Sequence, residues 1–152
     1  TRYTMPDHER AVIDAALTIL GGYLRQPGAA LCSPDAVQKY LRLHLANERR
    51  ELFGALFLDN QNRVIAFEVM FVGTISQTSV YPREVVLAAL GHEAAAVLLV
   101  HNHPSGSAQP SRADEHLTQT LKHALALVDV RVLDHVIVGG AAALSMAEQG
   151  LM

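Results

Sequence analysis

The chain has 152 residues, half of them hydrophobic, which suits one globular domain with a buried core. Its formal net charge of −3 gives no basic surface of the kind that binds nucleic acid or anionic membranes. The single cysteine, Cys32, excludes an internal disulfide and a cysteine-based zinc site, which fits a reducing compartment.

The apolar runs are too short for membrane insertion. The run Ala94–Val100, for example, is far shorter than the roughly 20 residues that span a bilayer. The first residues also lack the basic-then-apolar order of a signal peptide. We therefore expect a cytoplasmic protein that makes no membrane contact.

The first third of the chain predicts two helices joined by a loop. Apolar residues recur with helical spacing between Pro6 and Leu24. The loop QPGAALCSP ends in Ser33-Pro34, which resembles an N-cap followed by a proline in the first turn of a helix. That second helix carries apolar side chains on one face, namely Val37, Leu41 and Leu45.

The middle third predicts a hairpin and a helix. The stretch ELFGALFLD, residues 51–59, is rich in strand-forming residues, and the DNQNR that closes it is turn chemistry. Residues 64–73 then return as the second strand of the hairpin. Pro82 opens a helix that we expect to continue through Leu90.

The last third predicts a strand, a helix and a strand. AAAVLLVHNH, residues 94–103, does not alternate and is therefore predicted to be a strand buried on both faces. Residues 111–128 form the clearest predicted helix, and VRVLDHVIVGG, residues 130–140, is the next strand. LSMAEQG adds a short edge piece. The alternation predicts an α/β fold, a mixed β-sheet flanked by helices in one domain.

Two histidines stand at the carboxyl end of the strand at residues 94–103. Because strand side chains alternate, His101 and His103 share a face and Asn102 points to the other. After a proline–serine–glycine breaker, the next helix begins near Ser111 and carries Asp114 in its first turn. Two imidazoles and a carboxylate offer three ligands to zinc and leave a fourth position for water, which is the layout of a catalytic site.

The residues alone leave two questions open. Ser111 and Asp114 also have the spacing of a capping box, and Ser111 is able both to cap the helix and to serve the site. Zinc hydrolysis further needs a carboxylate that acts as a general base without binding the metal. Spacing does not choose among the candidates Glu51, Asp59, Glu68, Glu84 and Glu93.

The combined spacing resembles the signature of a known enzyme family. His101-x-His103, seven further residues and Ser111-x-x-Asp114 resemble the JAMM (MPN+/JAB) metalloprotease motif, and ELFG from Glu51 is similar to the context of that family's upstream glutamate. Four blocks resemble the RadC branch of the family over roughly residues 33–150: FLDNQNR, GTISQTSVYPREVVLAAL, HNHPSGSAQPSRAD and LVDVRVLDHVIVGG.

The resemblance implies a JAMM/MPN-type domain of cytidine-deaminase-like fold over residues 31–152, preceded by a helix and loop in residues 1–30. It implies a zinc metallopeptidase that cleaves peptide or isopeptide bonds in a peptide or protein substrate, with one Zn²⁺ per chain. His101, His103 and Asp114 would be the ligands. Glu51 would be the general acid/base for a zinc-activated water, and Ser111 would stabilise the tetrahedral intermediate.

Two other functions compete with this one. A nuclease linked to DNA repair is suggested by the letters HNH, but those residues are adjacent here, Asn102 faces away, and the net charge is acidic. Longer RadC relatives carry a DNA-binding helix-hairpin-helix module, for which we expect residues 1–30 to be too short. The second competing function is a binding module that a metal ion stabilises and that catalyses no reaction. A zinc deaminase is excluded, because its P-C-x-x-C ligands are absent.

The remaining histidines are weaker candidates for a role in the site. We interpret His135 as a satisfied core histidine, with the neighbouring Asp134 able to orient a ligand imidazole. Cys32 has no activating neighbour in the sequence and receives no catalytic role. The other five histidines are expected at the surface: His8, His44, His92, His116 and His123.

Overall fold

The computed structural model describes residues 4–24, 34–45, 47–75 and 78–152. Its elements, in chain order, are α1 (Asp7–Leu24), α2 (Pro34–Leu45), β1 (Leu52–Leu58), β2 (Val64–Val72), α3 (Pro82–Gly91), β3 (Ala96–Asn102), α4 (Arg112–Ala126), β4 (Arg131–Gly139) and β5 (Ala142–Ser145). The predicted elements are confirmed with small shifts at their ends. The predicted cap at Ser33 lies outside the described residues, as does Cys32.

The five strands form one mixed sheet in the order β2-β1-β3-β4-β5. β3 and β4 run parallel, whereas the other neighbouring pairs are antiparallel. A parallel pair needs a long crossover connection, and α4 supplies it. The predicted edge piece begins earlier than expected, since β5 covers residues 142–145 and the residues that follow form turns.

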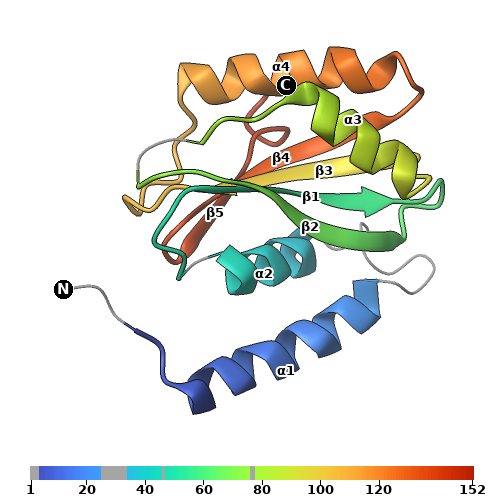
Figure 1. The fold of residues 1–152 in the computed structure, drawn as a ribbon. Helices are drawn as coiled ribbons and strands as arrows, with labels where there is room; N and C mark the ends of the chain where they lie inside the picture. Colours follow the sequence, from blue (N-terminus) through green and yellow to red (C-terminus); the bar gives the residue numbers. More distant parts are fainter. Residues whose placement is uncertain (1–3, 25–33, 46, 76–77) are drawn as a thin grey trace.

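Helices cover both faces of the sheet (Figure 1). On one face α2 contributes the buried side chains of Leu41 and Leu45, and on the other Leu121 and Leu125 of α4 join residues of α3. β1 and β3 are buried along their whole length, because their alternating side chains enter the two cores in turn. This confirms the predicted α/β class and explains why the sequence of β3 does not alternate.

α1 lies outside α2, away from the sheet (Figure 1). The apolar spacing predicted this helix correctly. However, its Val12 and Ile19 side chains are 69% and 61% exposed, while Leu17 and Leu20 pack against the α2-side core. Burial of the sheet therefore depends mainly on α2, α3 and α4.

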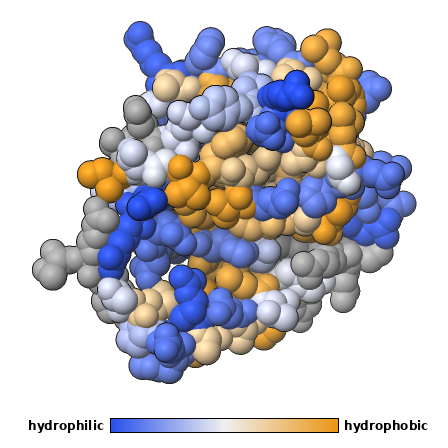
Figure 2. Space-filling view, viewed as in Figure 1, coloured by the Kyte–Doolittle hydropathy of each residue, from blue (hydrophilic) through white to orange (hydrophobic). Residues whose placement is uncertain are grey.

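The outer surface mixes polar and apolar residues (Figure 2). On the face shown, apolar side chains gather over α3, where Leu87 and Leu90 are each half exposed. Among the described residues, no helix combines the length and the apolar character that crossing a membrane requires.

Candidate metal centre

The predicted site residues lie together at one edge of the sheet, where the carboxyl ends of β3 and β4 meet. The parallel strands β3 and β4 both end at this edge, and α4 starts beside it. β1 runs antiparallel to β3 and pairs Phe53 with His101, so the residue before β1 lies at the same edge. Glu51 is that residue. Such crevices at the carboxyl ends of strands are common ligand sites in α/β sheets.

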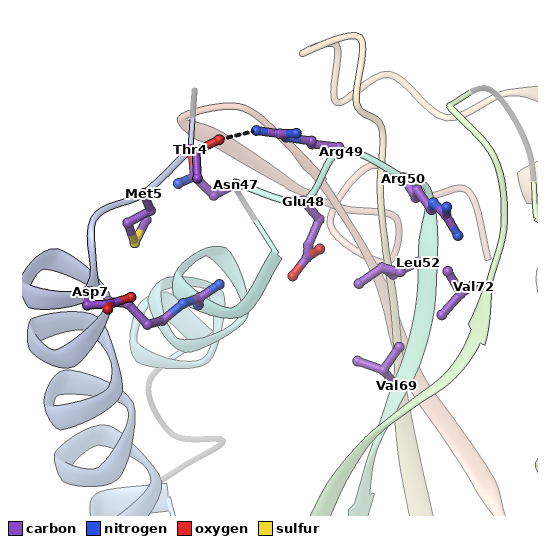
Figure 3. Close-up of a pocket in the computed structure, with 11 residues that line it drawn as sticks. Thr4, Met5, Asp7, Asn47, Glu48, Arg49, Arg50, Leu52, Val69 and Val72 are labelled. Atoms are coloured by element: carbon purple, nitrogen blue, oxygen red, sulfur yellow. Dashed lines mark hydrogen bonds between the residues drawn. The ribbon is translucent and has the colours of Figure 1, made fainter. Parts of the chain in front are cut away.

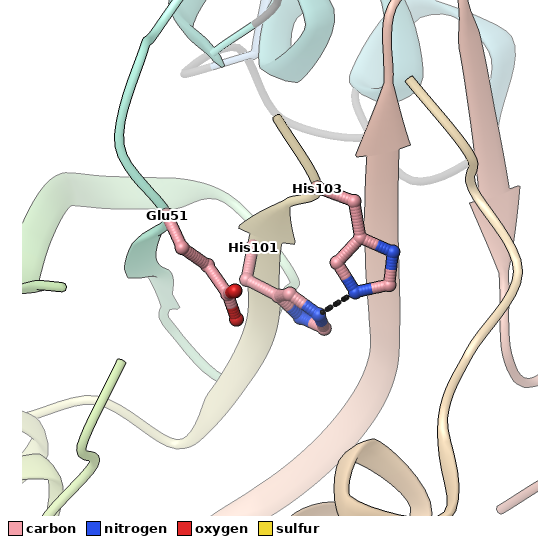
Figure 4. A group of neighbouring side chains, drawn as sticks. All are labelled: Glu51, His101 and His103. Carbon is pink, nitrogen blue, oxygen red and sulfur yellow. Dashed lines mark hydrogen bonds between the residues drawn. The ribbon is translucent and has the colours of Figure 1, made fainter. Parts of the chain in front are cut away.

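All five predicted site residues line one pocket of about 390 Å³. Its lining consists of Glu51, Phe53, Thr78, Val80, His101, His103, Ser111, Ala113, Asp114 and Leu117. Figure 4 shows the carboxylate of Glu51 extending toward the two imidazoles from the start of β1. Donor atoms of Glu51, His101 and His103 all lie within 4.8 Å of one another, so this group has the spacing to hold a metal ion.

Asp114 completes the cluster from the first turn of α4. Its Oδ1 lies 3.2 Å from Nε2 of His101, and its Oδ2 lies 3.3 Å from Nε2 of His103. The two Nε2 atoms are 2.9 Å apart (Figure 4). Two ligands of one tetrahedral zinc ion, each about 2.0–2.1 Å from the metal, are separated by about 3.3 Å. The spacing of these three side chains therefore fits a single zinc ion.

The partner of His103 fixes the state of its ring. Nδ1 of His103 lies 2.9 Å from the carbonyl oxygen of Ser107, which only accepts hydrogen bonds. Nδ1 must therefore carry a proton, so Nε2 presents a lone pair whenever the ring is neutral. We assign this tautomer from the hydrogen-bond partner.

A chain of buried groups fixes His101 in the same way. Its Nδ1 lies 2.7 Å from Nε2 of His135, and Nδ1 of His135 lies 2.6 Å from Oγ1 of Thr118. The Thr118 hydroxyl donates to the carbonyl oxygen of Asp114 at 2.7 Å, so it accepts from His135. His135 then accepts from Nδ1 of His101, so Nε2 of a neutral His101 presents a lone pair.

Two nitrogen lone pairs and a carboxylate thus converge on one point. Lone pairs that face each other at 2.9 Å repel unless a proton or a cation lies between them. Neutral imidazole nitrogens with a carboxylate form a typical donor set for zinc. The donor chemistry and the distances of His101, His103 and Asp114 therefore both fit a bound metal.

Charge and burial shift the pKa values around this point. Burial alone would raise the pKa of Asp114, but when His101 and His103 are protonated their Nε2–H groups donate to the carboxylate and hold its pKa well below the usual range. The hydrogen bond that the protonated ring of His103 donates to Asp114 raises the pKa of His103. Desolvation raises the pKa of Glu51, against the effect of the nearby histidines. Desolvation also lowers the pKa of the fully buried His135, which keeps that ring neutral.

Ser111 and Asp114 form the capping box as well as lining the pocket. Oγ of Ser111 accepts a hydrogen bond from the Asp114 backbone N–H at 3.1 Å, and Oδ2 of Asp114 accepts from the Ser111 backbone N–H at 2.7 Å. The helix cap and the metal cluster share these residues, because α4 starts where β3 ends. The two interpretations of the motif are compatible.

Asn102 faces the α2 side of the sheet, as the strand alternation predicted. Its buried Oδ1 accepts a hydrogen bond from the backbone N–H of Leu52 at 2.6 Å, and its Nδ2 donates to the carbonyl oxygen of Arg50 at 3.0 Å. These two contacts lie on either side of Glu51. The side chain between the two histidines therefore holds the segment that carries the carboxylate.

The sequence did not identify the contact of His135 with His101. Asp134 does not orient an imidazole; its side chain accepts from the backbone N–H of His135 and from Ser145 and Ala147. The sequence predicted that His135 lies in a strand and in the core. Its alignment with His101 depends on the register between β3 and β4, which local sequence does not encode.

Two of the histidines expected at the surface are not simple surface residues. His44 packs against the rings of Tyr40 and Phe67, and desolvation lowers its pKa. His92 contacts Phe57 and lies 2.9 Å from the carboxylate of Glu68. Both are partners of aromatic side chains at the sheet, an interaction that helical spacing alone did not indicate. The other three, His8, His116 and His123, are exposed as expected.

A larger pocket of about 650 Å³ lies beside the start of β1, near the N-terminus of α1 (Figure 3). Its charged lining includes the exposed Arg49 and Arg50 together with Glu48. Arg49 donates to the hydroxyl of Thr4 at 2.8 Å (Figure 3). Opposite charges mix here at an exposed surface, where solvent screens them, so we place the chemistry in the smaller pocket.

Fold and site together define a class: an α/β domain with a histidine–carboxylate cluster at the edge of a mixed sheet. Residues 31–151 match the family model of the RadC-like JAB domain. The chain therefore belongs to the RadC-like JAB domain family, as the sequence motifs predicted.

Similar proteins support this assignment. A UPF0758 protein of Acidovorax sp. (strain JS42) is 67% identical over 142 residues, which are 93% of this chain and 59% of that protein. A UPF0758 protein of Verminephrobacter eiseniae (strain EF01-2) is 65% identical over 142 residues, 93% of this chain and 60% of that protein. The chain thus spans about three-fifths of the length of these relatives.

Proposed function

We propose that this chain is a zinc-dependent metallohydrolase that cleaves peptide or isopeptide bonds. His101, His103 and Asp114 would hold the ion, with solvent at the open position. When bound, zinc supplies a Lewis acid that makes water nucleophilic near neutral pH. The observation that carries the proposal is the convergence of two imidazole lone pairs and a carboxylate, with a second carboxylate beside them in an open pocket.

Glu51 would act as the general acid/base. Its carboxylate faces His101 and His103, within 4.8 Å of their donor atoms. With Asp114 as the carboxylate ligand, Glu51 would be left to take a proton from water and pass it to the leaving amine. Burial raises its pKa, and a general base works best when its pKa approaches the working pH.

Ser111 would stabilise the negative charge that develops on the substrate's carbonyl oxygen. Its Oγ accepts a hydrogen bond from the backbone of Asp114 and keeps its own proton to donate. Ser111 is exposed and lines the pocket, so a substrate there would be able to reach it. A hydrogen-bond donor at this point would contribute to the transition state in the manner of an oxyanion hole.

The test separates metal binding from turnover. We expect about one zinc per chain by elemental analysis of the wild-type protein. Glu51→Gln should keep the zinc but lower kcat by about 10²–10⁴-fold on a library of peptides and isopeptides, because the proton acceptor is lost. His103→Ala should lose both zinc and activity. Glu84→Gln, which neutralises an exposed carboxylate on α3, is the matched control and should change neither.

Two results would contradict the proposal. Full activity in Glu51→Gln would remove the assigned acid/base. A wild-type protein that is loaded with zinc but cleaves no member of the library would instead indicate a metal-stabilised binding module.

A further inference from the structure

His135 and Thr118 lie directly behind the proposed ligands. Both side chains are 0% exposed. In the parallel pair β3–β4, His101 is opposite Ile137 and Leu99 is opposite His135, so His135 and His101 project from the same face. Thr118 is one turn after Asp114 on α4, which packs on that face. Three separate elements therefore bring these groups together.

Their hydrogen bonds form a chain that links two of the proposed ligands. The chain runs from Nδ1 of His101 to His135 at 2.7 Å, from His135 to Thr118 at 2.6 Å, and from Thr118 to the carbonyl oxygen of Asp114 at 2.7 Å. The Asp114 carboxylate in turn lies 3.2 Å from Nε2 of His101, so the two ends of the chain meet at the proposed metal site. Movement of any member would disturb the alignment of both ligands.

The hydrogen bonds of this chain all run in one direction. The Thr118 hydroxyl has two acceptors, the carbonyl oxygen of Asp114 and, at 3.7 Å, Sδ of Met146, and neither is able to donate. The hydroxyl proton therefore points away from His135, and Nδ1–H of His135 donates to Oγ1. Nε2 of His135 is then an acceptor, and the only proton of neutral His101 must lie on Nδ1.

We propose that His135, supported by Thr118, is a positioning residue that fixes the tautomer and the ring orientation of His101, so that its Nε2 lone pair points at the metal. This inference rests on the zinc site proposed above. Partners that hydrogen-bond to the far nitrogen of a ligand imidazole commonly control metal affinity in this way. A histidine that merely filled the core would affect stability without selecting a tautomer.

The first measurement uses the wild-type protein and needs no substrate. Long-range ¹H–¹⁵N NMR spectra of the metal-free and zinc-loaded protein should show His101 and His135 with the proton on Nδ1. If either ring carries its proton on Nε2 in the zinc-loaded protein, the proposal is overturned.

Variants supply the second measurement, the zinc Kd by competition with a chelator. His135→Leu removes both ring nitrogens and should raise Kd about 10–100-fold. Thr118→Val keeps the shape of the side chain without its hydroxyl and should raise Kd less, because His135 remains. Thr118→Ser restores the hydroxyl and should restore the affinity. Ile137→Val, a buried change on the same strand, controls for lost packing and should keep the wild-type Kd.

The outcomes distinguish this inference from the proposed function. If the wild-type protein binds no zinc, the metal site itself is wrong. If it binds zinc and Thr118→Val and His135→Leu bind equally well, only the positioning role is wrong. Should His135→Leu fail to fold, the Thr118→Val and Thr118→Ser pair and the tautomer spectra still decide the question.

Discussion

Asp114 carries two interactions that the residue pattern presents as alternatives. One carboxylate caps the first turn of α4 and also contacts both imidazoles. This is possible because Oδ2 is shared between the Ser111 backbone and His103, while Oδ1 faces His101. At the scale of single residues, helix capping therefore contributes to orienting a candidate ligand.

Asn102 provides a prediction at the same scale. Asn102→Ala should lower the free energy of unfolding by about 1–3 kcal/mol, because the buried N–H of Leu52 loses its acceptor. It should also reduce hydrolysis while zinc remains bound, since the lost contacts lie on either side of Glu51. Urea denaturation and zinc analysis check the two parts. Asn47→Ala, at an exposed position, is the control. If Asn102→Ala has the same free energy of unfolding as the wild-type protein, water replaces the amide as the hydrogen-bond partner of Leu52, and the prediction is wrong.

At the scale of elements, the loop between β3 and α4 lies against the end of β4. A Cβ built on the buried Gly139 would lie 2.5 Å from the backbone carbon of Ser107 and 2.6 Å from the backbone nitrogen of Ala108. Only glycine allows this approach. The same Ser107 supplies the carbonyl oxygen that binds Nδ1 of His103. The end of β4 thus sets the position of the loop that orients a candidate ligand.

Gly139→Ala should therefore affect both stability and metal binding. Overpacking against backbone atoms should cost about 1–3 kcal/mol in unfolding free energy. The zinc Kd should rise, because the Ser107 carbonyl oxygen is displaced from His103. Gly91→Ala is the matched control: its Cβ would meet nothing within 4 Å at the end of α3, so alanine there should be neutral or slightly stabilising. A Gly139→Ala protein with unchanged stability would refute the close approach.

At the scale of the whole molecule, the sheet is enclosed without α1. Among the described residues, helices α2, α3 and α4 supply the helical residues of the two buried cores, and α1 adds the partly buried Leu17 and Leu20. The family match also begins at residue 31, after this helix. The division between residues 1–30 and 31–152 stays a prediction that truncation tests.

A protein trimmed to residues 31–152 should fold cooperatively and bind zinc like the full chain. We expect the free energy of unfolding to fall by about 1–3 kcal/mol, which is the contribution of the two partly buried leucines of α1. Thermal unfolding followed by circular dichroism measures the stability, and competition with a chelator measures the zinc affinity. The 152-residue chain is the reference for both. A broad, non-cooperative melt of the trimmed protein would show that α1 is part of the folding unit.

Much of this molecule was predictable from local patterns. The strand–turn–helix order around His101 and the cap at Ser111 follow from alternation, helical spacing and turn chemistry, which act over a few residues. The interpretation of Val12 and Ile19 shows the limit of such patterns, because helical spacing indicates an apolar face without saying whether anything covers it.

The sequence by itself determined the order of the elements, the shared face of His101 and His103, and the family. Spacing left five candidate carboxylates, of which the family resemblance singled out Glu51. Only the tertiary structure showed that Glu51 lies beside the two histidines, and only it showed the contacts of His135 and Asn102. The physical reason is the distance along the chain over which each interaction acts. Local preferences depend on neighbours along the chain, whereas these contacts depend on how β1, β3 and β4 pair, and strand register is set by the packing of both cores at once.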